Sequence, residues 1–246
     1  EEDKPEKFAE KTVFYRMSLN GGEASKAFEI PYSVDAIKKI SDGVYAFSAI
    51  VDLNRPEKKE DLPEYYDYHV IEELPYWQNG AYFVSRFRST LFIFEEKTEA
   101  CRRVTEPLFA LGDFDVFRNT LIYKGVSYDH LLPQKNGLYC FDLSDSSVKE
   151  LCSPDRMHIG LFACDKASKE LKIYFSGSTM DKFGSGQYPD LYVYENGAVS
   201  MAAKFGNSIG GAPTGDIMLG GGVNMLVAEG KPYFCSCVGT RGEIYT

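Results

Sequence analysis

Two pairs of adjacent carboxylates could recognise a positively charged ligand. Glu72 and Glu73 form one pair, and Glu95 and Glu96 form the other. Carboxylates accept strong hydrogen bonds from cationic groups. Glu72 and Glu73 are therefore candidate contacts for the free amino group of a peptide. Solvated acids on turns or strand edges would give the same pattern, and this alternative stays open.

One serine stands in a pattern that nucleophilic serines often occupy. Residues 206–210 read G-x-S-x-G, with Ser208 at the centre. A nucleophile elbow needs a strand before the serine and a helix after it. Residues 211–215, GAPTG, are unsuited to starting a long helix. We therefore expect a loop at residues 206–222 and no catalytic role for Ser208.

The three histidines, His69, His130 and His158, show no spacing that indicates a catalytic triad or a metal site. A triad needs a serine, a histidine and an acid that converge in space. We interpret each histidine as a structural or surface residue. The chain also contains no phosphate-binding loop, zinc motif or calcium loop. The sequence thus predicts no catalytic residue, no metal and no cofactor.

The cysteines are scattered, and several stand within apolar stretches. Cys235 and Cys237 would share one face of a strand, but no further cysteine or histidine pair stands near enough to complete a metal site. We interpret all six as reduced, buried thiols of a cytoplasmic protein. They are Cys101, Cys140, Cys152, Cys164, Cys235 and Cys237.

The composition limits the partners of the chain. Its 246 residues carry a net charge of −9, without a basic stripe, which argues against nucleic acid as the main partner. No apolar run approaches the length of a membrane span, so we expect no membrane partner. The chain starts without Met and stops within an apparent strand at residues 243–246. We expect it to be a fragment of a longer polypeptide.

A strand pattern recurs along the chain and must position all of these residues. The anchor residues Leu91, Leu138, Leu191 and Ile244 recur about every 50 residues, with four short apolar stretches in each repeat. Such a repeat predicts an all-β fold, a β-propeller of four-stranded antiparallel blades. Very little of the sequence is typical of helix.

The strands of the blades can be placed from this pattern. A hairpin at 34–51 turns at Ser41-Asp42-Gly43. Residues 54–67 interrupt the period as a charged surface excursion with a tyrosine-rich end. The other expected strands are 13–17 and 24–30 (the last two strands of a blade), 82–84, 90–94 and 100–104, then 114–117, 121–123, 137–142 and 148–151, then 159–162, 171–175, 190–194 and 198–200, and finally a unit from 224–227 to 243–245.

Three of these strands are apolar on both faces. They are residues 91–94, 121–123 and 173–175. A sheet with one wet face would alternate instead. The continuous apolar runs therefore favour blades that stack face to face over an open meander.

Several stretches resemble the propellers of the prolyl oligopeptidase family, and most of all its acylaminoacyl peptidase branch. Residues 14–24, FYRMSLNGGEA, are similar to a recurrent strand and Asn-Gly-Gly-Glu unit of that family. The other similar stretches are 68–80, 88–93, 101–105 and 231–245. The hairpins differ, because the branch usually shows Ser-Pro-Asp-Gly, whereas this chain has Ser41-Asp42-Gly43.

The resemblance implies that this chain is a non-catalytic domain of a longer protein, separate from the catalytic domain. In the family, an α/β-hydrolase domain with the catalytic serine, aspartate and histidine follows the propeller. Residues 1–246 would then be a single, incomplete propeller domain, part of a ring of about seven blades. It would be a non-catalytic domain that restricts a serine peptidase to short peptides. Its expected partners are the C-terminal hydrolase domain of the same polypeptide and short peptide substrates.

Two other classes of function stay open. One is a stand-alone propeller that serves as an interaction scaffold, TolB-like or WD-repeat-like. The other is a propeller enzyme with a site in its own channel, which usually needs convergent histidines or carboxylates from several blades. The sequence downstream of Thr246 would discriminate best, since an α/β pattern with a true elbow supports the peptidase.

Overall fold

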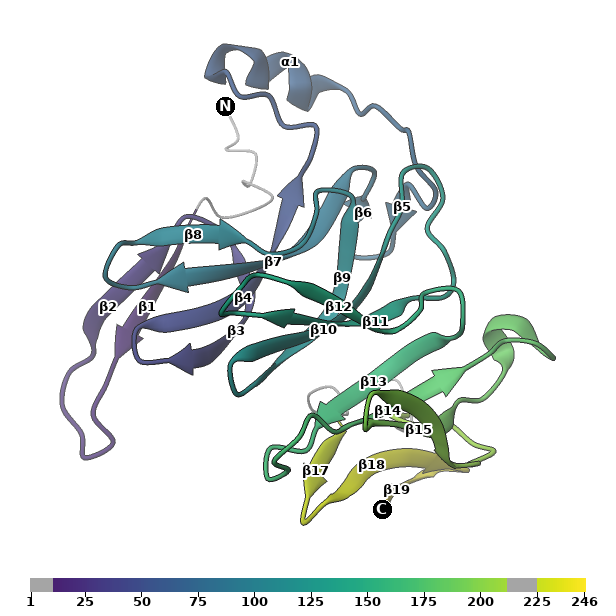
Figure 1. Cartoon of the computed structure of the whole chain (residues 1–246). Helices are drawn as coiled ribbons and strands as arrows, with labels where there is room; N and C mark the ends of the chain where they lie inside the picture. The colour runs from purple at the N-terminus through teal and green to yellow at the C-terminus, as the bar shows by residue number, and fades with distance from the viewer. Residues whose placement is uncertain (1–10, 212–224) are drawn as a thin grey trace. The chain divides into compact units, whose positions relative to one another are not determined.

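The protein is built almost entirely of antiparallel β-strands, as the repeat predicts (Figure 1). The computed structural model describes residues 11–211 and 225–246. Three parts of the sequence lie outside the described residues. They are the stretch at 1–10, the second part of the loop predicted at 206–222, and residue 224, which opens the last expected unit. No helix in the described ranges is long and apolar enough to cross a membrane.

The first complete blade confirms the predicted hairpin. Its four strands lie in the order β3-β4-β7-β8 and are all antiparallel. Asp42-Gly43 forms the turn, where Gly43 has φ 72°, a left-handed conformation that favours glycine. The strands are β3 (Val34–Ser41), β4 (Val44–Asp52), β7 (Phe87–Glu95) and β8 (Ala100–Arg103).

The excursion between β4 and β7 contains a short helix that the sequence did not predict. The 3₁₀ turn η1 (Lys59–Asp61) leads into α1 (Leu62–Asp67), which has a proline in its first turn. The Tyr65 hydroxyl donates a hydrogen bond to Asp52 at the end of β4. The tyrosine-rich end of the excursion is thereby fastened to the blade.

The prediction that residues 82–84 supply a blade strand was wrong. β6 (Tyr82–Phe83) pairs with β5 (Trp77–Gln78) in a separate two-stranded sheet. Tyr82 has φ 60° and Arg86 has φ 63°, so the backbone leaves the extended conformation twice before β7 begins. The Trp77 ring also meets Phe83 edge-on at 5.1 Å, which stabilises the separate ribbon.

A smaller sheet, β1 (Thr12–Arg16) with β2 (Ser25–Ile30), packs against the first blade. Phe28 of β2 lies 4.9 Å from the Tyr45 ring and 5.1 Å from the Phe94 ring. Phe28 and Phe94 belong to one buried cluster with Phe47 and Phe92, and the partly buried Tyr45 packs against it. The strands expected at 13–17 and 24–30 are therefore present and supply part of an apolar core.

The remaining strands also follow the predicted repeat. One sheet has the order β12-β11-β10-β9, the next has β13-β14-β15-β16, and the last has three strands, β17-β18-β19. A short turn, η2 (Gly184–Gly186), precedes β15. The strands are β9 (Phe109–Phe117), β10 (Thr120–Ser127), β11 (Gly137–Asp142), β12 (Val148–Cys152), β13 (His158–Cys164), β14 (Ile173–Ser178), β15 (Asp190–Glu195), β16 (Ala198–Ala203), β17 (Leu226–Ala228), β18 (Lys231–Val238) and β19 (Arg241–Tyr245).

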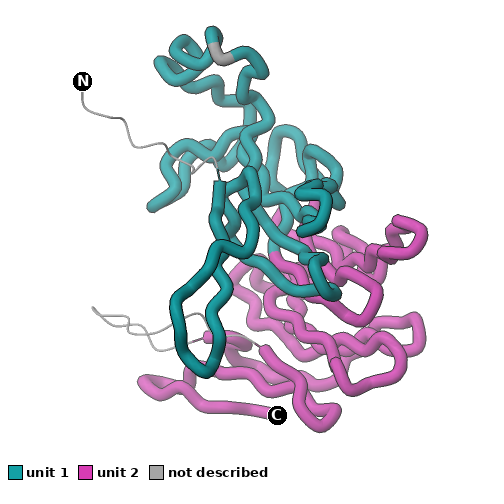
Figure 2. The backbone as a smooth tube through the Cα atoms, turned by 90° about the vertical axis from the view of Figure 1, so that its left-hand side faces the viewer, with its two compact units in different colours: residues 1–112, 127–132 teal, residues 113–126, 133–246 magenta. Residues whose placement is uncertain are grey.

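The chain divides into two compact units, which Figure 2 colours separately. The first contains residues 1–112 and 127–132, and the second contains 113–126 and 133–246. Within the second unit, Ile122 and Leu138 of one sheet share a buried core with Ile159, Ile173 and Phe175 of the next. These two sheets thus bury apolar faces against each other, as expected for the strands at 121–123 and 173–175 that are apolar on both sides.

Candidate functional site

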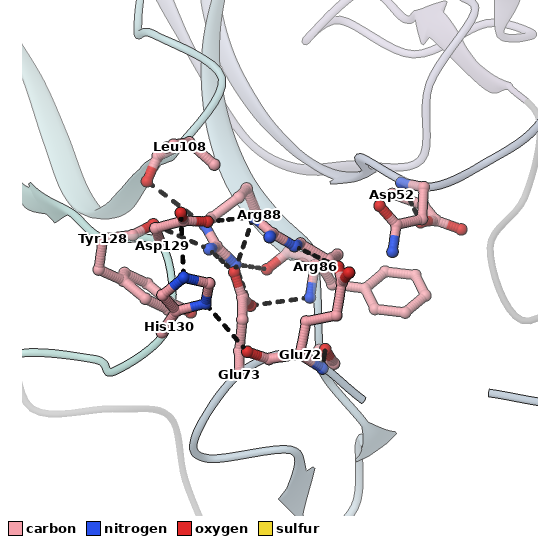
Figure 3. Close-up of polar contacts among 12 residues, drawn as sticks. Asp52, Glu72, Glu73, Arg86, Arg88, Leu108, Tyr128, Asp129 and His130 are labelled. Carbon is pink, nitrogen blue, oxygen red and sulfur yellow. Dashed lines mark hydrogen bonds and ion pairs between the residues drawn. The ribbon is translucent and has the colours of Figure 1, made fainter. Parts of the chain in front are cut away.

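A cluster of two arginines and three carboxylates lies where three segments of the first unit meet (Figure 3). We call Glu72, Glu73, Arg86, Arg88 and Asp129 the arginine–carboxylate cluster. Backbone hydrogen bonds hold two of the segments side by side. Leu74 donates its N–H to the His130 carbonyl at 2.8 Å, and Leu132 donates to the Leu74 carbonyl at 2.9 Å.

Glu73 and Arg88 form the buried centre of the cluster. Their side chains are 1% and 0% exposed. Arg88 binds the carboxylate through both terminal nitrogens, with Nη1 3.0 Å from Oε2 and Nη2 against Oε1. The backbone N–H of Arg86 donates to the same carboxylate at 2.8 Å. A buried carboxylate requires such partners, because losing its water is costly.

Arg88 uses its remaining donors on backbone carbonyls. It donates to Tyr128 at 3.2 Å and to Leu108 at 3.4 Å, and its guanidinium lies 3.8 Å from the centre of the Tyr128 ring. One side chain on β7 therefore joins the segments that carry Glu73, Leu108 and Tyr128. This arrangement is structural, since its donors are directed at protein atoms.

The outer part of the cluster is organised by Arg86. Its Nε donates to Glu72 at 2.9 Å and its Nη1 donates to Asp129 at 2.7 Å. The hydrogen bond from Arg86 is the main reason that the pKa of each carboxylate lies below its usual value. In return, chiefly through Glu72, these acids raise the pKa of the Arg86 guanidinium. Both acids are thus held in the ionised form.

The two acids proposed to contact a peptide amine differ in how accessible their carboxylates are. Both oxygens of Glu73 are already bound by arginine N–H groups inside the protein. The Glu72 side chain is 43% exposed and lines a cavity. The contact to a peptide amine stays a prediction, and the geometry directs it to Glu72. Sequence reasoning missed Arg86 and Arg88, which stand 14 and 15 residues from their partners.

The second acid pair, Glu95 and Glu96, lies at the other end of β7 and does not join the cluster. Glu95 accepts a hydrogen bond from Thr98 at 3.3 Å. Glu96 lies 3.5 Å from Arg16 and accepts a 3.5 Å hydrogen bond from the Tyr45 hydroxyl. These contacts are those of acids at a strand end and turn.

The histidines make local structural contacts. His130 Nδ1 lies 3.3 Å from the Glu72 carbonyl, and His158 Nδ1 lies 2.9 Å from the Gln134 carbonyl. The His69 ring stacks on Phe83 at 4.2 Å. Among the described residues, no group of three His, Cys, Asp or Glu side chains is arranged to hold a metal ion.

Ser208 lies in a loop that is fastened to β18. Its hydroxyl accepts a hydrogen bond from the Cys237 N–H at 3.3 Å. The neighbouring Asn207 donates its side-chain amide to the Cys237 carbonyl at 3.1 Å. The predicted loop is therefore present as far as residue 211, and Ser208 has a structural role in it.

A cavity of about 430 Å³ lies beside the cluster, between the excursion and the segments before β7. We call it the tyrosine pocket. Its aromatic walls are Tyr65, Tyr68, His69, Phe83 and Phe87. The acids that line it are Asp61, Glu64 and Glu72. The sequence signal for this pocket was the run Tyr65-Tyr66-Asp67-Tyr68, but the run alone did not indicate a cavity.

Comparison by sequence finds no matching family model and no matching curated protein. Comparison by structure finds clear similarity to peptidases. The orthorhombic crystal form of Pyrococcus horikoshii acylaminoacyl peptidase matches with a TM-score of 0.64 at 14% identity, over 96% of this chain and 35% of that chain. The uncomplexed form of that enzyme matches with a TM-score of 0.61 at 13% identity, over 92% and 34%.

A third similar structure is the β-propeller domain of the Trilobed protease from Pyrococcus furiosus. It matches with a TM-score of 0.53 at 13% identity, over 96% of this chain and 64% of that chain. At these identities the similarity concerns the fold. The fold is a β-propeller of the kind found in these peptidases, and the resemblance to the acylaminoacyl peptidase propeller is confirmed at that level. The chain spans about a third of the acylaminoacyl peptidase.

Proposed function

We propose that residues 1–246 are a non-catalytic β-propeller domain of a longer serine peptidase, where it restricts access to short peptides. One observation carries the proposal. Nearly the whole chain, 96%, superimposes on an acylaminoacyl peptidase, yet it covers only 35% of that enzyme. The proposed partners are a C-terminal α/β-hydrolase domain of the same polypeptide and short peptide substrates.

The proposed role is physical exclusion. A propeller placed over an active site admits substrates through its channel or by separation of the two domains. A short peptide can pass either route, whereas a folded protein is too wide. Large chains would then be kept from the reacting groups, whereas water, which peptide hydrolysis consumes, is small enough to enter.

The chain itself is proposed to supply no catalytic group. Ser208 is hydrogen-bonded to the backbone of Cys237 rather than to a histidine base. The proposed compartment is the cytoplasm, on the interpretation of the six cysteines as reduced thiols. A thiol titration of the unreduced, unfolded protein that finds paired cysteines would contradict that assignment.

A serine-reactive fluorophosphonate probe tests whether the catalytic serine lies outside residues 1–246. The full-length protein should be labelled, and the 246-residue chain should not. Labelling of the 246-residue chain that disappears in Ser208→Ala would overturn the proposal. A full-length protein without a hydrolase domain and without labelling would also overturn it, and would favour the stand-alone scaffold.

A further inference from the structure

We infer that the tyrosine pocket binds the side chain of a lysine or arginine within a peptide. The inference follows from the lining of the cavity and does not depend on the gating role. The pocket is lined by residues of the excursion, by residues 68–72 that follow it, and by Phe83, Ser85 and Phe87, all within the first unit. The proposed binding site is therefore formed by one compact part of the chain.

The aromatic walls are held in place by other contacts. Tyr65 is fixed by its hydrogen bond to Asp52, and burial, followed by this contact, raises the pKa of its hydroxyl. The Tyr68 hydroxyl donates to Glu64 at 3.3 Å. His69 is stacked on Phe83 at 4.2 Å. Aromatic faces attract cations, and side chains that already make such contacts lose less freedom when a ligand binds.

The charges that face the pocket favour a cation. Asp61, Glu64 and Glu72 line it, whereas its described lining contains no lysine or arginine. Two arginines act from outside the lining. Arg86 binds Glu72 but is shared with Asp129, and Arg55 slightly opposes the raised pKa of Tyr65. An anionic ligand would meet three carboxylates at close range, so charge complementarity selects a basic group.

The size of the cavity favours a peptide over a simple cation. About 430 Å³ lies within the range of pockets for organic ligands. A lysine or arginine stem can lie along the aromatic walls while its charged end reaches Glu64 or Glu72. The remaining space accommodates neighbouring peptide backbone. Glu73 takes no part, because Arg88 and Arg86 already occupy its carboxylate.

Calorimetric titration of the full chain with three blocked tripeptides tests this assignment. The probes are acetyl-Gly-Lys-Gly-amide, its norleucine analogue, which keeps the stem but lacks the charge, and its glutamate analogue. The lysine peptide should bind, and its affinity should be at least about tenfold higher than that of the norleucine peptide. Its affinity should fall as salt is raised, because part of the attraction is electrostatic.

Matched variants locate the site. Glu64→Gln and Glu72→Gln should each weaken the lysine peptide about two- to fivefold, as expected for exposed ion pairs. Glu57→Gln, an exposed acid of the same excursion that does not line the cavity, should leave affinity unchanged. Tyr68→Leu should weaken binding while circular dichroism stays that of the parent chain.

Three results would overturn the inference. They are equal binding of the lysine and norleucine peptides, tighter binding of the glutamate peptide, and no detectable binding of the lysine peptide. Loss of affinity in Glu57→Gln equal to that in Glu64→Gln would also contradict it, since the effect would then be one of overall charge. None of these results bears on peptidase labelling, so failure here is distinguishable from failure of the proposed function.

Discussion

Arg88 is the residue on which the architecture of the candidate site depends. Its partners are 15, 20 and 40 residues away along the chain, at Glu73, Leu108 and Tyr128. A guanidinium can serve so many acceptors because its donors point outward in a fixed plane. The sequence identified Glu73 as a chemically capable residue. The sequence could not show that the Glu73 carboxylate is already hydrogen-bonded within the protein, because the tertiary fold brings Arg88 to it.

Removing either member of the buried pair should destabilise the first unit strongly. Glu73→Ala and Arg88→Met should each cost about 3–5 kcal/mol of unfolding free energy, because each leaves a buried polar group without its partner. Urea unfolding followed by the fluorescence of Trp77, the single tryptophan, would measure this cost. The double variant Glu73→Ala/Arg88→Met should lose less than the sum of the two single variants.

The neighbouring acid provides the control for this experiment. Glu72→Ala removes an exposed carboxylate from the same cluster and should change the unfolding midpoint little. Single variants at Glu73 and Arg88 that unfold at the midpoint of the parent chain would show that the pair does not hold these segments together.

Arg86 should control the titration of the two outer acids. Because it lowers the folded-state pKa of Glu72 and Asp129, each acid stabilises the fold above its ordinary pKa, 4.5 and 3.8. That contribution is lost as the pH falls through the lowered pKa. Arg86→Gln should move both pKa values up toward 4.5 and 3.8, as measured by NMR titration of the carboxyl carbons. Unchanged values would show that another group sets them.

At the scale of elements, the excursion turns a regular blade into one that carries a pocket. β4 and β7 pair along their full lengths although residues 53–86 lie between them. The sequence predicted this interruption from the lengthened repeat. It did not reveal α1, because six residues are too few to show a helical period. It misplaced Tyr82 because a left-handed backbone conformation at a tyrosine has no local signal.

The hairpin between β3 and β4 shows how well a local signal can work. Asp42-Gly43 was predicted as a turn, and Gly43 adopts φ 72°. Gly43→Ala should lower the unfolding free energy by about 1–2 kcal/mol, because an alanine is strained in this conformation. The added Cβ would lie 3.7 Å from Glu96 Cβ, an ordinary contact, so crowding contributes little.

Gly186→Ala is the matched control for this variant. Gly186 has no positive φ, and an added Cβ would find no atom within 4 Å. Its substitution should leave urea stability unchanged or slightly higher. If both alanine variants behave alike, the turn conformation at Gly43 is not the origin of its effect.

For the molecule as a whole, the fold was predicted mainly from the sequence repeat. Apolar runs such as residues 91–94 are buried, and the four-stranded sheets lie at the predicted places. The period recurs along the chain, and inner strands such as residues 91–94, 121–123 and 173–175 are apolar on both faces, so several repeats indicate the same fold. The tyrosine pocket and the arginine–carboxylate cluster are not part of the repeat. They depend on contacts between distant segments, which the repeat could not show.

The proposed gating role is a property of the full-length protein and is measured there. The measurement compares cleavage of a short peptide with cleavage of the same local sequence displayed on a folded protein, at matched concentrations. We predict rapid cleavage of the peptide and no measurable cleavage of the folded protein, because the propeller would exclude the folded protein. Equal rates for the two substrates would contradict the gating role even in an active peptidase.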